Sequence, residues 1–420
     1  MNLYFFIRPF VRFGLKLYFK NIFIAGLNKI PSDKSIIIAS NHPTAFFEPI
    51  LLACLHSRSF NFLTRGDIFK KAFYHNLLSK LHMIPIFRFR DGHENMKKNQ
   101  EIFNLCNQKL SDNQALVIFP EGHLSTGIGL DKLQKGTARM AFSALQNNPS
   151  IDLYIIPVTY YYSNPHHYRG DAFVECSKSI HVNSYFEAYK EHDALTINKL
   201  TAQLEEAMAE KVITIADDKY KTMVRSILKM YRNEFFIKRN EVIFKDRQIY
   251  QNSRLISNNF LELDTNQKEA LFMSFQDLEK EAATTNYDIH YPKSNSSKIK
   301  LFFAIIMGFI PFLIGYLNLF PLKIAKSYTQ KKIDEKAFFG PVLFGTSMIV
   351  WFFYYVLWVI VSFLVQNLFL HLYVILLPFI TYYSIYYYDF IKFEINSLHI
   401  NSIIESKRSE FMTKIDNLLV

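Results

Sequence analysis

The longest uncharged stretch of the sequence constrains the fold most. From Ala337 to Tyr388 there is no Asp, Glu, Lys or Arg. A bilayer core about 30 Å thick takes roughly 20 apolar residues per helix, so this stretch has room for two crossings. The segment "VQNLFLH" predicts a tight turn between spans near 341–364 and 369–388. We therefore expect a helical hairpin that returns the chain to the side from which it came.

A second apolar segment, "LFFAIIMGFIPFLIGYLNLF" (301–320), also lacks charge and contains Gly308, Pro311 and Gly315. Lysines lie on both sides of it, at 293, 298 and 300 before it and at 323, 326, 331, 332 and 336 after it. Because positive flanks favour the cytoplasmic face, we predict a re-entrant hairpin here, with a plain span as the alternative. The predicted membrane region is 296–390, and 391–420 is predicted to be a cytoplasmic tail.

The rest of the chain has the composition of a soluble domain, since 20% of all residues are charged. The formal net charge of +11 predicts an anionic lipid surface as a partner and no nucleic acid, because the Lys and Arg residues flank apolar segments. The three cysteines, Cys54, Cys106 and Cys176, lack metal-ligand spacing and are expected to be buried, reduced thiols. We predict no metal.

The N-terminal residues 1–30 have cations at every fourth position, Arg8, Arg12, Lys16 and Lys20. This spacing predicts one basic stripe on a helix whose aromatic residues lie on other faces. We expect an amphipathic helix that lies in the headgroup plane of a membrane. The alternative is an ordinary helix packed on the domain that follows.

Residues 31–185 alternate between short apolar runs and helical patterns. Strands are expected at 35–39, 60–63, 83–87, 115–119, 153–162 and 172–176. Alternation of this kind predicts an α/β domain, a mixed sheet flanked by helices. From 186 to 295 the periodicity is helical and charge is abundant, which predicts a helical subdomain before the transmembrane helices.

The stretch "SNHPTAFFEPI" follows the first predicted strand and carries His42 and Glu48. The carboxyl ends of strands are where sites gather in α/β sheets. A neutral imidazole takes a proton from an alcohol when a second group holds its other ring nitrogen. The pair therefore predicts a catalytic dyad, with Glu48 orienting His42. No Ser or Cys nucleophile is evident nearby, which favours direct attack by a substrate hydroxyl.

Two further stretches carry candidate binding residues. "ALVIFPEGHLSTG" ends a strand with Phe119, Pro120, Glu121 and Gly122, a strand tip that presents one carboxylate and several backbone amides. In "MIPIFRFRDG", Arg88 and Arg90 alternate with phenylalanines, so both guanidinium groups are expected on one face, where they suit a phosphate. The bland alternatives are a tight turn and a solvated sheet edge.

Four stretches in order, "NHPTAFFE", "IPIFRFR", "FPEG" and "IIPV", resemble the sequence blocks of the glycerophosphate acyltransferase family. The resemblance covers roughly residues 35–180. It implies that His42 is the general base on the acceptor hydroxyl and that Arg88 binds the acceptor phosphate. It further implies that Glu121 and Gly122 place the glycerol moiety and that Pro157 lies near the acyl chain.

One position departs from the family pattern. The family usually has H-x4-D, but here Phe47 occupies that position and the acid is Glu48, giving H-x5-E. Some fungal-type glycerol-3-phosphate acyltransferases resemble this sequence in having the extra residue, although with Asp. The longer glutamate side chain is expected to offset the changed backbone path.

The resemblance implies acyl transfer from an acyl thioester, carried by coenzyme A or acyl-carrier protein, to glycerol 3-phosphate or its 1-acyl derivative. No cofactor is implied beyond that co-substrate. We expect an integral membrane protein with a cytoplasmic catalytic domain and membrane lipids as partners. Two alternatives stay open, namely acylation of another lysolipid or an amino-acid lipid, and a catalytically inactive lipid-binding protein.

Overall fold

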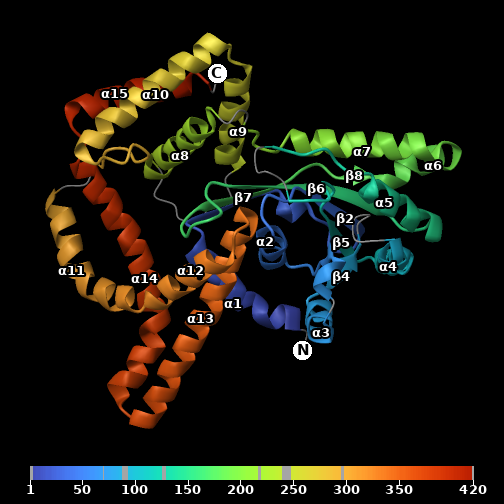
Figure 1. Cartoon of the computed structure of the whole chain (residues 1–420), viewed down its shortest axis with the longest axis horizontal. Helices are drawn as coiled ribbons and strands as arrows, with labels where there is room; N and C mark the ends of the chain where they lie inside the picture. The colour runs from blue at the N-terminus through green and yellow to red at the C-terminus, as the bar shows by residue number, and fades with distance from the viewer. Residues whose placement is uncertain are drawn as a thin grey trace. The chain divides into compact units, whose positions relative to one another are not determined.

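The computed structural model describes residues 3–69, 71–87, 93–124, 129–215, 219–238, 247–294 and 298–418 (Figure 1). The chain divides into two compact units. The first is built mainly from Met1–Pro165 and Gly170–Thr214, and the second mainly from Ile215–Val242 and Gln248–Val420. The first unit therefore extends past residue 185, where the sequence pattern placed the end of the α/β domain.

The first unit contains an eight-stranded mixed sheet with the strand order β1-β7-β6-β2-β5-β3-β4, and β8 pairs with β6. Five of these strands (β6, β2, β5, β3 and β4) run parallel, while β7 and β8 are antiparallel to β6. The strands are β1 (Asn21–Ala25), β2 (Ser35–Ser40), β3 (Asn61–Arg65), β4 (Met83–Ile86), β5 (Ala115–Ile118), β6 (Leu153–Tyr162), β7 (Asp171–Cys176) and β8 (Ile180–His181).

Helices cover both faces of this sheet, which is why its central strands are continuously apolar. All six residues of β2, "SIIIAS", are buried. On one face, Ile37 and Leu116 belong to a core cluster with residues of α4, α5 and α7. On the other face, Phe47 of α2 contacts Tyr162 of β6. The helices of this unit are α1 (Leu3–Tyr18), α2 (Phe47–Leu55), α3 (Ala72–Lys80), α4 (His93–Ser111), α5 (Gly136–Asn147), α6 (Phe186–Glu191) and α7 (Asp193–Ala209). The predicted α/β fold class is confirmed.

The N-terminal segment differs from its prediction as one helix over 1–30. Helix α1 ends at Tyr18, and residues 21–25 form β1, which pairs in parallel with β7. The sequence "NIFIA" alternates between half-buried and buried positions, as an edge strand does. One face of α1 packs through Leu15 and Tyr18, while Phe5 and Phe6 are exposed. Binding of that exposed face to a membrane surface stays a prediction.

The second unit is helical throughout its described elements. Two helices, α13 (Lys336–Val365) and α14 (Leu368–Leu398), are long and apolar enough to cross a membrane. A third crossing is counted if the bent pair α11 (Lys298–Leu317) and α12 (Phe320–Lys332) is one span. The turn between α13 and α14 falls at Gln366 and Asn367, inside the predicted turn. The other helices are α8 (Lys221–Lys238), α9 (Arg247–Glu262), α10 (Thr265–Thr285) and α15 (Ser402–Asp416).

A polar cluster within the second unit joins α8 to the segment that precedes α11. Asp288 contacts His290 Nδ1 at 2.5 Å, and His290 Nε2 lies 3.2 Å from the Ser226 hydroxyl of α8. Burial alone would raise the pKa of Asp288, but its hydrogen bonds to His290 and the charges of His290 and Lys229 together lower it to about 2. The ionised carboxylate is therefore the form that the folded protein stabilises.

Candidate active site

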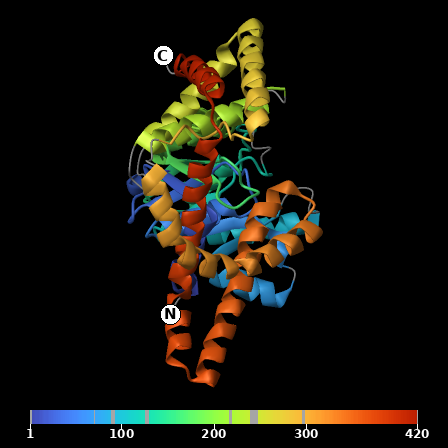
Figure 2. The ribbon, with the colours of Figure 1, turned by 90° about the vertical axis from the view of Figure 1, so that its left-hand side faces the viewer.

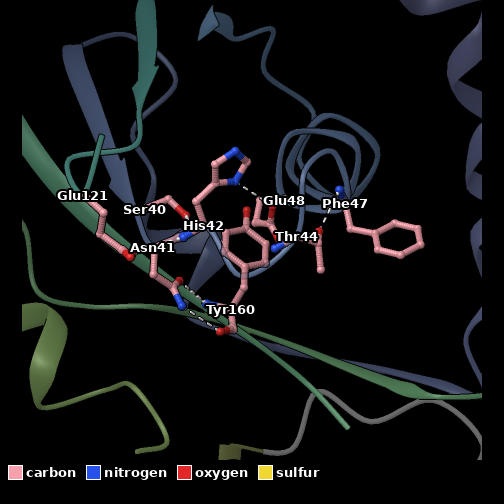
Figure 3. Close-up of polar contacts among 8 residues, drawn as sticks. All are labelled: Ser40, Asn41, His42, Thr44, Phe47, Glu48, Glu121 and Tyr160. Atoms are coloured by element: carbon pink, nitrogen blue, oxygen red, sulfur yellow. Dashed lines mark hydrogen bonds and ion pairs between the residues drawn. The ribbon is translucent and has the colours of Figure 1, made fainter. Parts of the chain in front are cut away.

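The site lies at the carboxyl edge of the sheet, where two neighbouring parallel strands end. Strand β2 ends at Ser40 and leads through Asn41 to His42. Strand β5 ends at Ile118 and leads through Phe119 to Glu121. Because β2 and β5 are paired in parallel, both exits lie on the same edge. Figure 3 shows the resulting group of side chains.

His42 and Glu48 form the predicted pair. His42 Nδ1 lies 2.9 Å from Glu48 Oε2, with Nε2 turned away from Glu48 (Figure 3). The side chain of Glu48, in the first turn of α2, is only 1% exposed, against 16% for that of His42. With Nδ1–H donating to the carboxylate, Nε2 is the nitrogen with a free lone pair. The geometry is that of an oriented base with one open nitrogen.

Thr44 holds the second oxygen of the same carboxylate. Glu48 Oε1 accepts hydrogen bonds from Thr44 N at 3.2 Å and from the Thr44 hydroxyl at 2.8 Å. The hydroxyl oxygen in turn accepts from Phe47 N at 3.2 Å, at the start of α2. A buried carboxylate is costly without such partners, so these bonds make the position of Glu48 tenable. Thr44 therefore fixes the carboxylate from the side opposite His42.

Asn41 fixes the backbone from which His42 projects. Its Nδ2 donates to Tyr160 O at 3.0 Å, and its Oδ1 accepts from Tyr160 N at 2.8 Å. The last backbone pair between β2 and β6 is Ser40 with Val158, so the Asn41 amide continues the ladder by one further step. Asn41 is 2% exposed, and both its bonds form away from water.

The segment Phe119–Gly122 forms a tight turn. Gly122 N donates to Phe119 O at 3.1 Å, and Pro120 supplies a fixed φ at the second turn position. Gly122 has φ 75°, which a residue with a Cβ adopts only under strain. The turn places the Phe119 ring against the His42 imidazole, with centroids 3.9 Å apart and planes 18° from parallel. Phe119 therefore covers one face of the base.

Glu121 is the second buried carboxyl group of the site. It is 1% exposed, and its Oε1 accepts from His42 N at 3.3 Å. Its Oε2 is buried and has no hydrogen-bond partner among the described residues. Burial raises the pKa of Glu121 to about 8, and the charge of Asp131 and that of Glu48 act in the same direction. Glu121 is therefore mainly protonated at neutral pH, unlike a solvated carboxylate.

The other predicted site residues are distributed as follows. Pro157 is buried in β6 beside Ala39 of β2 and falls between the stretches of β6 that pair with β8 and with β7. Its missing N–H therefore leaves no ladder hydrogen bond unmade. Arg88 and Arg90, predicted to bind phosphate, lie outside the described residues. In the part of the chain that is described, no group of three or more His, Cys, Asp or Glu side chains is placed to hold a metal ion.

Sequence reasoning missed Asn41 and Thr44. Both stand inside the stretch that carries His42 and Glu48, so their position was the available signal. Thr44 stands two residues before Phe46, the N-cap of α2, and its hydroxyl accepts from Phe47 N, the first residue of that helix. The partner of Asn41 is 119 positions away in sequence, and only the pairing of β2 with β6 reveals it.

Comparisons with known proteins point to one family. Residues 21–161 match the family model described as Acyltransferase. The match starts at the first residue of β1 and ends one residue before β6 does. The matched part of the chain contains the whole group of side chains described above.

Two curated relatives come from Saccharomyces cerevisiae. Glycerol-3-phosphate O-acyltransferase 1 is 24% identical over 168 residues, which cover 37% of this chain and 22% of the relative. Glycerol-3-phosphate O-acyltransferase 2 is 26% identical over 192 residues, covering 46% of this chain and 21% of the relative. The chain thus matches about a fifth of the length of each. A solved structure of the 1-acyl-sn-glycerophosphate acyltransferase PlsC from Thermotoga maritima aligns with 16% identity and a TM-score of 0.33, covering 48% of this chain and 78% of that one.

Proposed function

We propose that this chain, whose residues 21–161 match the Acyltransferase family model, is an integral membrane O-acyltransferase of phospholipid synthesis. It transfers a fatty acyl group from an acyl thioester to a hydroxyl of glycerol 3-phosphate or 1-acyl-glycerol 3-phosphate. Its catalytic domain faces the cytoplasm, and its apolar C-terminal helices keep it at the bilayer, where a long-chain product is released.

The observation that carries the proposal is the held imidazole of His42. Its Nδ1 is bonded to Glu48 at 2.9 Å, and that carboxylate is itself held by Thr44. A base oriented in this way is what activation of an alcohol requires. The same geometry argues against an inactive lipid-binding protein. Burying a carboxylate and satisfying its hydrogen bonds is explained by a catalytic His–Glu pair, whereas lipid binding alone does not require it.

The reaction then proceeds without a covalent acyl-enzyme. His42 Nε2 takes the proton of the acceptor hydroxyl as its oxygen attacks the thioester carbonyl carbon. Glu48 stabilises the imidazolium that forms, as the carboxylate of a catalytic triad does. When the C–S bond breaks, the imidazolium returns the proton to the leaving thiolate. The products are an ester and a free thiol.

The acceptor is bound by groups near this edge of the sheet. Glu121, protonated at neutral pH, adds no negative charge that would repel a phosphate-bearing acceptor. Arg88 follows β4, whose carboxyl end lies on the same edge as those of β2 and β5, and we propose it as the phosphate ligand with Arg90 beside it.

The test is acyl transfer by the full-length protein reconstituted in lipid vesicles. Glycerol 3-phosphate, lysophosphatidate and lysophosphatidylcholine are offered separately with long-chain acyl-coenzyme A or acyl-carrier protein. We expect product from one of the two acceptors that carry a phosphate monoester, glycerol 3-phosphate or lysophosphatidate, and a loss of at least about 10³-fold in His42→Ala. His181→Ala, on the exposed side chain of β8, is the matched control and is expected to keep wild-type activity.

The outcomes separate the alternatives. Product from the choline lysolipid alone would replace the proposed acceptor class with another lysolipid. Equal product from wild type and His42→Ala would refute the role of His42. No product from any acceptor would favour a lipid-binding protein.

A further inference from the structure

The bent helix pair α11–α12 has two readings by composition, a broken span or a loop that re-enters. The second unit holds the contacts that decide between them. All of the contacts used below join described residues of that unit, between 294 and 397. The argument concerns which ends of the four helices lie at the same level.

Helix α11 runs antiparallel to α14. The Tyr387 hydroxyl donates to Ala304 O and Ile305 O, near the start of α11. Further along, the Ser384 hydroxyl donates to Phe312 O at 3.0 Å. At the end of α11, the Tyr373 hydroxyl donates to Asn318 Oδ1 at 2.9 Å. Residue numbers rise along α11 while they fall along α14.

Two glycines permit this close approach. A Cβ on Gly308 would lie 2.2 Å from the Tyr387 ring, and one on Gly315 would lie 2.1 Å from the Ser384 hydroxyl. The two helices therefore touch along the length of α11, as small residues allow in membrane helix pairs. Just before α11, Ser294 N donates to the Ser397 hydroxyl at 2.7 Å, so α11 starts at the level where α14 ends.

Helix α12 returns along α13. Phe320, at the start of α12, contacts the ring of Tyr354, and Thr329 contacts Thr346 at 3.1 Å. Helix α12 is therefore antiparallel to α13, and its last turns lie nearer the beginning of α13 than its first turns do. Because α13 and α14 form an antiparallel hairpin, the beginning of α13 and the end of α14 lie on one side. The pair α11–α12 thus starts and ends on that same side.

Asn318 stands at the turning point. Its Oδ1 accepts from both the Tyr354 hydroxyl of α13, at 2.6 Å, and the Tyr373 hydroxyl of α14. Toward the turn at Gln366 and Asn367, α13 and α14 pack against each other, as in the contact of Trp358 with Tyr373. Figures 1 and 2 both show the α13–α14 hairpin extending past the bend between α11 and α12.

The returning arm is the shorter of the two. From Ala304 to Asn318 the helix rises about 21 Å at 1.5 Å per residue, and from Phe320 to Thr329 about 14 Å. Helix α12, the returning arm, is therefore too short to cross a bilayer core of about 30 Å by itself. Lysines on α12 are able to reach back to the headgroups by extending their side chains. They are Lys323, Lys326, Lys331 and Lys332.

The outer face of α11 is apolar and exposed in the structure. We infer that α11 and α12 form a re-entrant hairpin that enters the membrane and leaves on the same side, with lipid acyl chains as the partner of this face. The face is continuous with the membrane-spanning pair α13–α14, and basic residues flank it at both ends. It comprises Phe302, Phe303, Ile306, Met307, Ile310, Leu313 and Leu317.

Single cysteines in the full chain test this topology. We choose four exposed positions, Met273 in α10, Ser327 in α12, Val365 at the hairpin turn and Ser406 in α15. Each variant is expressed in bacterial cells and exposed to a membrane-impermeant maleimide in intact and in permeabilised spheroplasts. The native cysteines are buried, so the unsubstituted protein is the blank.

We expect the positions in α10, α12 and α15 to react from one side of the membrane and Val365→Cys from the other. If α11–α12 were a plain span, the positions in α12 and α15 would react from the side opposite α10, and Val365→Cys would react from the side of α10. That result would overturn the inference. Labelling of all four from one side would overturn it as well, because α13–α14 would not cross.

A depth measurement provides an independent check. Nitroxide labels at Ile299, Leu317 and Tyr328, all exposed, are compared by their accessibility to oxygen and to a water-soluble relaxation agent. We expect Leu317 to be the deepest and the other two to be shallow and similar. A label at Leu317 that is no deeper than the labels at Ile299 and Tyr328 would contradict the hairpin.

Discussion

Replacing Glu121 by Gln tests whether the buried carboxyl group after β5 is neutral in the folded protein. Burial raises the pKa of Glu121 from 4.5 to about 8, with the charges of Asp131 and Glu48 adding to the rise. Gln keeps the oxygen that accepts from His42 N and carries no charge at any pH. We therefore expect Glu121→Gln to behave as the neutral form of the wild-type side chain does.

The sign of the pH dependence follows from the raised pKa. A group of this kind holds its proton more tightly when folded than when unfolded, so its contribution is fully present below the unfolded pKa. It is lost as the pH rises from about 4.5 toward 8. The whole window corresponds to roughly 4–5 kcal/mol, at about 1.4 kcal/mol for each step of one in pH. Between about pH 5 and pH 7 we expect the wild type to lose about 3 kcal/mol of unfolding free energy relative to Glu121→Gln.

The three cysteines supply the assay. Cys54, Cys106 and Cys176 lie in α2, α4 and β7 of the first unit, and all are buried. Their labelling at increasing urea concentration therefore reports unfolding of the sheet. Tryptophan fluorescence does not, since the two tryptophans lie in α13. Comparing midpoints of wild type and variant at each pH cancels the pH dependence of thiol reactivity.

Glu187→Gln, at an exposed position of α6, is the matched control and is expected to track the wild type at every pH. A difference between wild type and Glu121→Gln that stays constant from pH 5 to pH 8 would refute the neutral carboxyl. If the unfolding free energy of the wild type instead rises relative to that of Glu121→Gln as the pH increases, the predicted direction of the pH dependence is wrong.

Three other substitutions follow from the contacts described above. Thr44→Val removes the hydroxyl bonded to Glu48, and we expect kcat of acyl transfer to fall roughly 10–100-fold, the cost of one hydrogen bond to a charged group; an unchanged kcat would show that Thr44 does not hold the carboxylate. Asn41→Ala leaves two buried Tyr160 backbone groups unpaired, so the urea midpoint of thiol labelling should report a loss of about 2–4 kcal/mol, and a loss under 1 kcal/mol would contradict the role of that bond pair. Asp288→Asn should be less stable than wild type above about pH 4, and this gap should close as the pH falls to about 2, since the lowered pKa gives stability that is lost on protonation; thermal unfolding at several pH values would show a constant gap if Asp288 is not ionised when folded.

The strands could be predicted from the sequence where the strand itself carries the signal. Runs such as "SIIIA" and "LYIIPVTYYY" are apolar over their whole length because β2 and β6 are covered on both faces. Strand β1 was missed, since "NIFIA" follows a helix whose aromatic residues continue the same pattern. Its partner β7 lies about 150 residues away, and a pairing that remote leaves no local trace. Strand β8 spans two residues and is too short to show a period.

The site divides in a similar way. Residue type and order were enough to predict His42 and Glu48 as a pair, and the structure brings them to hydrogen-bond distance. The neutral state of Glu121 was not foreseen, because it depends on how completely the turn at Phe119–Gly122 is covered. A strand tip was expected to present a carboxylate, whereas the structure presents a buried and mainly protonated acid at neutral pH. Burial is a property of the assembled fold and is not visible in a short motif.

The departure from H-x4-D is best understood as two changes that offset each other. An extra residue precedes the acid, and the acid is longer by one methylene group, so the carboxylate still lies 2.9 Å from His42 Nδ1. Glu48→Asp alone would withdraw the carboxylate by about 1.5 Å, beyond hydrogen-bond distance. Deleting Phe46 alone would push the longer side chain past the imidazole. We expect each change alone to lower kcat roughly 100-fold and the combination, which recreates H-x4-D, to recover at least about 10-fold over either, a coupling of about 4 kcal/mol or more. If the combined variant shows only the product of the two separate losses, the extra residue and the glutamate are independent, and the compensation argument fails.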